Sequence, residues 1–144
     1  MEQNVHINDD EDILALLKNV KKIAVVGLSP KANRPSHRVS KAMQEFSYQI
    51  IPVRPAVDRI LEEKVYKNLH DIPFAVDLVN VFRAPKYVPE IVEECIACKV
   101  PAIWLQEGVI HPEAAQHAVE AGRKVIMDRC SYKEYLRLIV NNDA

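Results

Sequence analysis

The sequence predicts an α/β domain built on a parallel sheet of about five strands. Short runs rich in valine and isoleucine alternate with longer segments of helical periodicity along the chain. This alternation is typical of parallel sheets whose strands are connected by helices. The length of 144 residues suits one domain with a single core. Right-handed crossovers then give a Rossmann-like, doubly wound sheet in a three-layer α/β/α sandwich.

The first half contains two helices and two strands. Apolar residues at helical spacing predict a helix over about 9–20, and 22–28 is an apolar run that reaches a turn at Gly27. Ser36 is expected to cap the second helix, whose apolar stripe ends at Phe46. A strand follows at 48–53. Residues 56–73 are ambiguous: a charged connection, with a short strand at 64–66 and a short helix before Pro73.

The second half repeats the rhythm. Strands are predicted at 77–82, 102–106 and 124–127. Helices are predicted at 86–99, from His111 with Pro112 in its first turn, and at 132–140. His111 is expected to cap its helix. We expect one domain over 1–144, with 1–11 as a flexible N-terminal segment.

Composition narrows the class of protein. Nineteen Lys and Arg balance twenty Asp and Glu, so no global basic field favours nucleic acid. No apolar run approaches the ~20 residues that span a bilayer, and the acidic N-terminus is unlike a signal peptide. Three cysteines fit reduced thiols rather than a disulfide scaffold. We expect a soluble cytoplasmic protein.

Ligands of doubly wound sheets bind at the carboxyl ends of the strands, which selects the loops there. The loop from Gly27 to Ser36 joins a strand to a helix N-terminus, whose amides and dipole favour an anion. Lys31 and Arg34 add cations, and Ser29 and Ser36 add hydroxyl groups. The alternative is a solvated connection before a capped helix.

This loop departs from the dinucleotide fingerprint, because Ser29 stands where G-x-G-x-x-G has its second glycine. The second strand is followed by Arg54 and Pro55 rather than by the acid of NAD sites. A cation there suits a phosphorylated ribose, as in NADP or the 3′-phosphoadenosine of coenzyme A. The alternative is an exposed loop cation.

The other strand ends complete the candidate site. Phe82, Arg83 and Pro85 follow the middle strand and offer an apolar wall with one cation. Gln106 and Gly108 follow the next strand, and the glycine would allow close approach of a ligand to the backbone. Each segment alone is ordinary turn chemistry, but all of them are expected at one edge of the sheet.

Several short motifs together resemble a known family, over about residues 12–140. The motifs are 23–27, 34–36, 51–53, 76–79, 81–83, Trp104-Leu-Gln106-x-Gly108 and 127–130. Together they are similar to the small bacterial and archaeal CoA-binding proteins, and to the N-terminal CoA-binding domain of the succinyl-CoA synthetase alpha subunit. Arg54, Lys99 and Glu107 depart from the family's usual residues.

The resemblance implies a Rossmann-like fold that holds coenzyme A or an acyl-CoA across the strand ends. It places Gly27, Ser29, Pro30, Arg34 and Ser36 around phosphate. Lys31 joins this set only because it is a cation in the same loop. It also places Arg54 and Pro55 beside the nucleotide, with Phe82, Arg83 and Pro85 beside the adenine or pantetheine and Gln106 and Gly108 on the far side. The synthetase's phosphorylated histidine lies in a second domain, so the resemblance implies binding without independent catalysis, in an accessory or regulatory role in acyl-CoA metabolism.

Rival interpretations remain open. An NADP-binding oxidoreductase module is disfavoured by the missing glycines, and a purely structural interaction domain would leave the strand-end residues unexplained. Cys95 and Cys98 match C-x-x-C but continue the apolar stripe of their helix, which favours reduced, buried, metal-free thiols over redox or zinc chemistry. Cys130 follows the last strand, as a small buried residue or as a partner for a CoA thiol. Asp128 and Arg129 are expected to form an ion pair.

Overall fold

The computed structural model describes residues 7–141, and its centre is a sheet of five parallel strands. The strands are β1 (Lys22–Val26), β2 (Gln49–Val53), β5 (Leu78–Val81), β6 (Ala102–Leu105) and β7 (Lys124–Met127). Their order across the sheet is β2-β1-β5-β6-β7, and each neighbouring pair is parallel. The Rossmann-like α/β fold is therefore confirmed.

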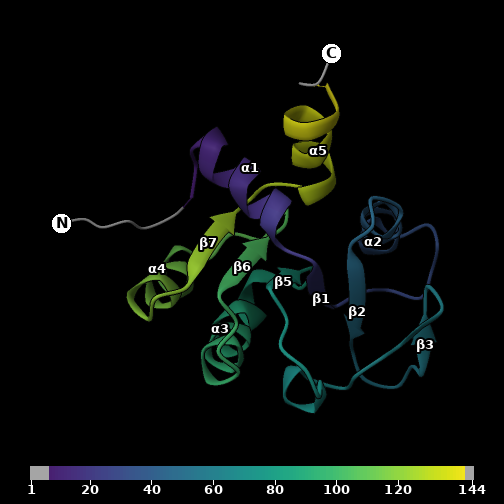
Figure 1. Cartoon of the computed structure of the whole chain (residues 1–144). Coiled ribbons are helices and arrows are strands. Elements are labelled where there is room, and N and C mark those ends of the chain that lie inside the picture. Colours follow the sequence, from purple (N-terminus) through teal and green to yellow (C-terminus); the bar gives the residue numbers. More distant parts are fainter. Residues whose placement is uncertain (1–6, 142–144) are drawn as a thin grey trace.

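Helices cover both faces of the sheet, as Figure 1 shows. On one face lie α1 (Asp10–Asn19), α2 (Pro35–Glu45) and α5 (Ser131–Tyr135), which continues into the π-helical η3 (Leu136–Val140). On the other lie α3 (Val88–Ala97) and α4 (Pro112–Glu120). Each strand contributes alternate side chains to the two faces, so one sheet supports two apolar cores.

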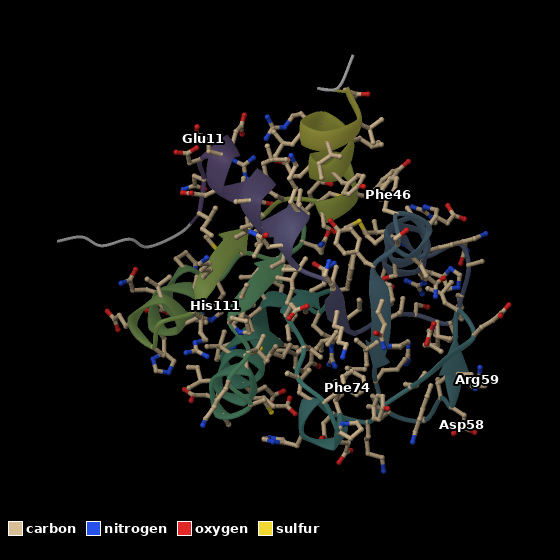
Figure 2. All side chains as sticks on the ribbon, viewed as in Figure 1. Glu11, Phe46, Asp58, Arg59, Phe74 and His111 are labelled. Atoms are coloured by element: carbon tan, nitrogen blue, oxygen red, sulfur yellow. The ribbon has the colours of Figure 1, made fainter. Side chains whose placement is uncertain are left out.

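Aromatic side chains hold α2 and α5 together. Phe46, labelled in Figure 2, follows α2 and stacks on Tyr135 of α5 with ring centroids 3.9 Å apart. Trp104 of β6 is fully buried under these helices, and its indole N–H donates to the Arg129 carbonyl at 2.8 Å. The chain between β7 and α5 is thereby fixed against the sheet.

The ambiguous segment after β2 forms short elements. A two-stranded antiparallel ladder joins β3 (Arg59–Ile60) to β4 (Glu63–Lys64), and Leu61 and Glu62 turn between them with positive φ. The strand expected at 64–66 is therefore split: β4 ends at Lys64, and Tyr66 bridges Val53 at the edge of the main sheet. Two 3₁₀ turns follow, η1 (Leu69–Asp71) and η2 (Pro85–Tyr87), the second leading directly into α3.

The N-terminal segment that the sequence analysis expected to be flexible is described only from Ile7 onward. The Ile7 amide donates to the Val125 carbonyl at 2.8 Å, and Asp10 and Glu11 form the first turn of α1. Residues 1–6 lie outside the described part. No helix within 7–141 has the length and apolar character to cross a bilayer.

Candidate functional site

An open cleft of about 1070 Å³ runs along the carboxyl ends of the parallel strands. The loops after β1, β2, β5, β6 and β7 all contribute to it. Nine predicted site residues line it, namely Gly27, Ser29, Pro30, Lys31, Arg34, Ser36, Arg54, Phe82 and Gln106. The strand order explains their convergence, because β1 lies between β2 and β5 at the point where the chain changes direction across the sheet.

Gly27 follows β1 and has a φ of +90°. A β-carbon there would lie 2.4 Å from the Phe82 carbonyl oxygen and 2.9 Å from Arg83 Cδ. Only glycine fits at this position, because Phe82 and Arg83, which follow β5, occupy the space that a side chain would need. This requirement comes from packing and leaves no signal in the sequence.

The loop after Gly27 is closed by two serines. The Ser29 amide donates to Ser36 Oγ at 3.0 Å, and the Lys31 amide donates to Ser29 Oγ at 3.1 Å. The prediction that Ser36 caps the helix is wrong: α2 begins at Pro35, and Arg34 is its N-cap residue. Pro35 suits the first helical position because its fixed φ is helical and it has no N–H to satisfy. Ser36 is therefore buried in the first turn, where its hydroxyl group holds the loop.

The side chains that line the cleft include five cations and one carboxylate. They are Lys31, Arg34, Arg38, Arg54 and Lys133, and the carboxylate is Glu107. Glu107 pairs with Lys133, whereas none of the other four cations forms a salt bridge among residues 7–141. Arg34 and Arg38 lie one helical turn apart and enter the cleft from the same side of α2. The arrangement favours a ligand with several negative charges.

Arg54 joins the loops after β1 and β2. Its Nη1 donates to the Leu28 carbonyl at 3.2 Å, and its buried Nε has no partner within the described residues. Buried donors are nearly always satisfied, so a ligand acceptor fits this position. Arg54 also borders a second cavity of about 500 Å³ on the α3 side, lined in part by Pro55, Asn68 and Arg83.

Two of the predicted site residues line neither cavity. Pro85 begins η2, and the Gly108 amide donates to Asp128 Oδ1 at 2.8 Å instead of facing a ligand. The expected ion pair between Asp128 and Arg129 is also wrong. Arg129 pairs with Glu134 at 3.1 Å, because Glu134 lies in the next turn of α5 and Asp128 is turned toward Gly108.

Gln106 lines the cleft with a side chain that is already engaged. Its Nε2 donates to Asn80 Oδ1 and to Ser131 Oγ, and its Oε1 accepts from the Ser131 amide at 3.3 Å. Gln106 is only 3 % exposed. It therefore ties the ends of β5 and β6 to the start of α5, and it positions the cleft wall more than it offers hydrogen bonds to a ligand.

The three cysteines are free and have different surroundings. Cys95 is fully buried, as predicted, and burial raises the pKa of its thiol. Cys98 is half-buried rather than buried, with its Sγ 3.4 Å from His70 Nδ1. Cys130 is buried but borders the cleft. The His111 cap is confirmed, since its Nδ1 accepts from the Ala114 amide at 3.1 Å.

Nine further residues line the cleft and were not among the predicted site residues. They are Pro35, Arg38, Val39, Ala42, Glu107, Val109, Cys130, Tyr132 and Lys133. Of these, the sequence suggested only Glu107 and Cys130 as neighbours of the site. Arg38 could have been found from its i,i+4 spacing to Arg34. Tyr132 and Lys133 follow the strand at 124–127, so the strand-end rule also pointed to them.

Comparison with known proteins gives consistent matches. A protein-family model described as a CoA binding domain matches residues 21–135. The uncharacterized protein YneT of Bacillus subtilis is 45 % identical over 119 residues, which cover 83 % of this chain and 88 % of that protein. The ADP-forming acetate–CoA ligase II of Archaeoglobus fulgidus is 31 % identical over 112 residues, covering 72 % of this chain and 17 % of the ligase.

Solved structures agree with the fold. A hypothetical protein from Pyrococcus horikoshii superposes with a TM-score of 0.89 at 37 % identity, over 96 % of this chain and 99 % of that one. A Thermus thermophilus protein, cell-free ID.343, superposes with a TM-score of 0.87 at 34 % identity, over 91 % and 99 % of the two chains.

Proposed function

Because this chain belongs to the CoA-binding domain family, we propose that its cationic cleft binds coenzyme A or an acyl-CoA. The observation that carries the proposal is the set of four cations without salt-bridge partners in the described residues, gathered at the ends of β1 and β2 around the start of α2. Coenzyme A presents a diphosphate and a 3′-phosphate, which require cations and amide donors close together.

Within this proposal, the Gly27–Ser36 loop and the start of α2 receive the diphosphate. Arg54 meets the 3′-phosphate, using the buried Nε that has no partner in the described residues. Pro55 and Arg83 lie beyond Arg54 at the second cavity and would contact the nucleotide from there. Phe82 lines the main cleft and would provide an apolar contact for the adenine or the pantetheine arm.

We further propose that the chain acts as a CoA-binding accessory or regulator and has no turnover of its own. The chain spans 17 % of the length of the Archaeoglobus ligase, so that enzyme's activity belongs to a much larger protein. A ligase assay with acetate, CoA and ADP or ATP checks this part: we expect no thioester formation or cleavage by the purified protein, and turnover would contradict it.

Titration calorimetry with CoA, dephospho-CoA, NAD and NADP tests the ligand itself. CoA should bind tightest, and dephospho-CoA about tenfold more weakly, since one charge-assisted contact contributes roughly 1.5–3 kcal/mol. Equal affinity for CoA and dephospho-CoA would remove Arg54 from its proposed role. Tighter binding of NADP than of CoA would favour the oxidoreductase module instead.

A further inference from the structure

An ion pair lies on the β6–β7 side of the cleft, on elements other than those that carry the four other cations. Lys133 Nζ lies 3.0 Å and 3.2 Å from the two carboxylate oxygens of Glu107. Glu107 follows β6 and Lys133 lies in α5, which follows β7, and both side chains line the cleft. The cleft therefore has a cationic end at β1 and β2 and an electrically balanced end at β6 and β7.

The length of the ligand fits this division. From β1 to β7 there are three steps between neighbouring strands, or roughly 14 Å at ~4.8 Å per step. The pantetheine arm has about as many backbone bonds as four amino-acid residues, so it also extends over roughly 14 Å at ~3.5 Å per residue. With the diphosphate at the start of α2, the sulfur atom reaches the end formed by Glu107, Cys130 and Lys133.

Resting on the proposed function, we infer that Glu107 and Lys133 make this end of the cleft select acyl groups without charge over acyl groups that end in a carboxylate. A carboxylate on the acyl chain would lie beside Glu107, and Lys133 is already neutralised by that residue. If Lys133 turned toward the ligand, Glu107 would lose its partner and face a second negative charge. Exchanging one ion pair for another therefore gives no gain and adds a repulsion.

Butyryl-CoA and succinyl-CoA test this inference, because both acyl groups have four carbons and only the second ends in a carboxylate. Calorimetry gives the ratio of their dissociation constants within each protein, so any effect common to both ligands cancels. The natural protein should prefer butyryl-CoA by about two- to fivefold, the range that exposed charge pairs support. Glu107→Gln should shrink this preference or reverse it, and Lys133→Gln should widen it.

Opposite shifts in the two variants are the signature of charge selection, because mere loosening of the loop would move both ratios the same way. Equal affinity of the natural protein for the two acyl-CoAs, or tighter binding of succinyl-CoA, would overturn the inference. Free CoA is titrated in the same series. If CoA itself fails to bind, the proposed function is wrong; if CoA binds and the ratios do not move, only the selection by Glu107 and Lys133 is wrong.

Discussion

The amide of Ser29 donates a 3.0 Å hydrogen bond to Ser36 Oγ, so the loop after β1 is closed onto the first turn of its own helix. Ser36 is 6 % exposed, and water cannot easily replace this contact. The bond fixes the residues that border the cleft on its cationic side.

Ser36→Ala should lower the free energy of unfolding by about 1 kcal/mol, the net contribution of one hydrogen bond, and should also weaken CoA binding. Ser40→Ala is the matched control. Ser40 lies one turn later in α2 and is equally buried, but its Oγ has no hydrogen-bond partner in the described residues. Removing that hydroxyl should leave stability unchanged or raise it. Urea unfolding measures both, and equal losses would contradict the role of the Ser29–Ser36 bond.

Gly27→Ala should be strongly destabilising, because the new β-carbon would lie 2.4 Å from a backbone oxygen atom of Phe82. Gly122→Ala is the comparison, since Gly122 has a similar φ of +84° but open space around it. The unfavourable φ alone should cost about 1–2 kcal/mol at Gly122. The clash should add about 1–3 kcal/mol at Gly27. Similar losses in a denaturant titration of the two variants would show that the Phe82 contact relaxes freely.

Stability should fall above about pH 8.5, the ordinary pKa of a thiol. Burial raises the pKa of Cys95 in the folded protein. The folded state therefore holds this proton more tightly than the unfolded chain. The resulting stability is complete below the unfolded pKa and is lost as the pH rises toward the folded one. The slope should approach about 1.4 kcal/mol per pH unit between pH 9 and 10.

Cys95→Ala tests the assignment of that slope. It should lower stability at pH 7 because it leaves a small cavity, and it should flatten the decline above pH 8.5. Unfolding in urea at several pH values separates the two effects. An unchanged slope in Cys95→Ala would show that another group is responsible.

The sequence predicted the sheet because its strands are continuous apolar runs, buried on both faces. It could not predict the segment after Pro55, where the ladder depends on positive φ at Leu61 and Glu62 and on the bridge from Tyr66 to Val53. None of these features leaves a periodic pattern, because a two-residue strand is too short to show one.

The position of a site residue could be predicted where it follows the end of a strand. The hydrogen-bond partner of a polar side chain could not be predicted. Gln106 was placed correctly at the end of β6, but its engagement with Asn80 and Ser131 depends on contacts 25 and 26 residues away. The same holds for Glu107 and Lys133, whose pairing requires the loops after β6 and β7 to be side by side. The turn at Gly27 was predicted, and the reason that this residue has to be glycine, the Phe82 carbonyl, was visible only in the fold.

Arg34→Ala should weaken CoA binding about tenfold, since a charge-assisted hydrogen bond contributes roughly 1.5–3 kcal/mol. Lys41→Ala is the control: it removes the same charge from the same helix, but Lys41 is exposed and does not line the cleft. Its effect should be small. The loss in Arg34→Ala should shrink at high salt, because exposed charges are screened. Equal losses in both variants would indicate a general field rather than a local contact.

CoA should protect one cysteine from alkylation and leave another unprotected. Cys130 lines the cleft. If the pantetheine arm extends along the cleft as proposed, it ends beside Cys130, so bound CoA should cover its thiol. Cys98 is half-buried beside His70 and does not line the cleft, which makes it an internal control in the same sample. Only the thiolate reacts with iodoacetamide, so labelling is done near pH 8.5, where an ordinary thiol is about half ionised.

Peptide mass spectrometry then follows labelling at each cysteine over time, with and without CoA at a concentration far above its dissociation constant. Iodoacetamide is kept in large excess over CoA, because the ligand's own thiol also consumes the reagent. The labelling rate of Cys130 should fall in proportion to the occupied fraction, about a hundredfold when the ligand is at 100 times that constant. The rate at Cys98 should change far less, because Cys98 lines neither cavity and only its neighbour His70 borders the second one. Dephospho-CoA, which has the same thiol arm, should protect Cys130 equally once its concentration is raised to match its weaker binding. Protection of both cysteines would indicate a general tightening of the fold. Unprotected Cys130 in protein saturated with CoA would place the sulfur elsewhere and reverse the direction in which the ligand runs along the sheet.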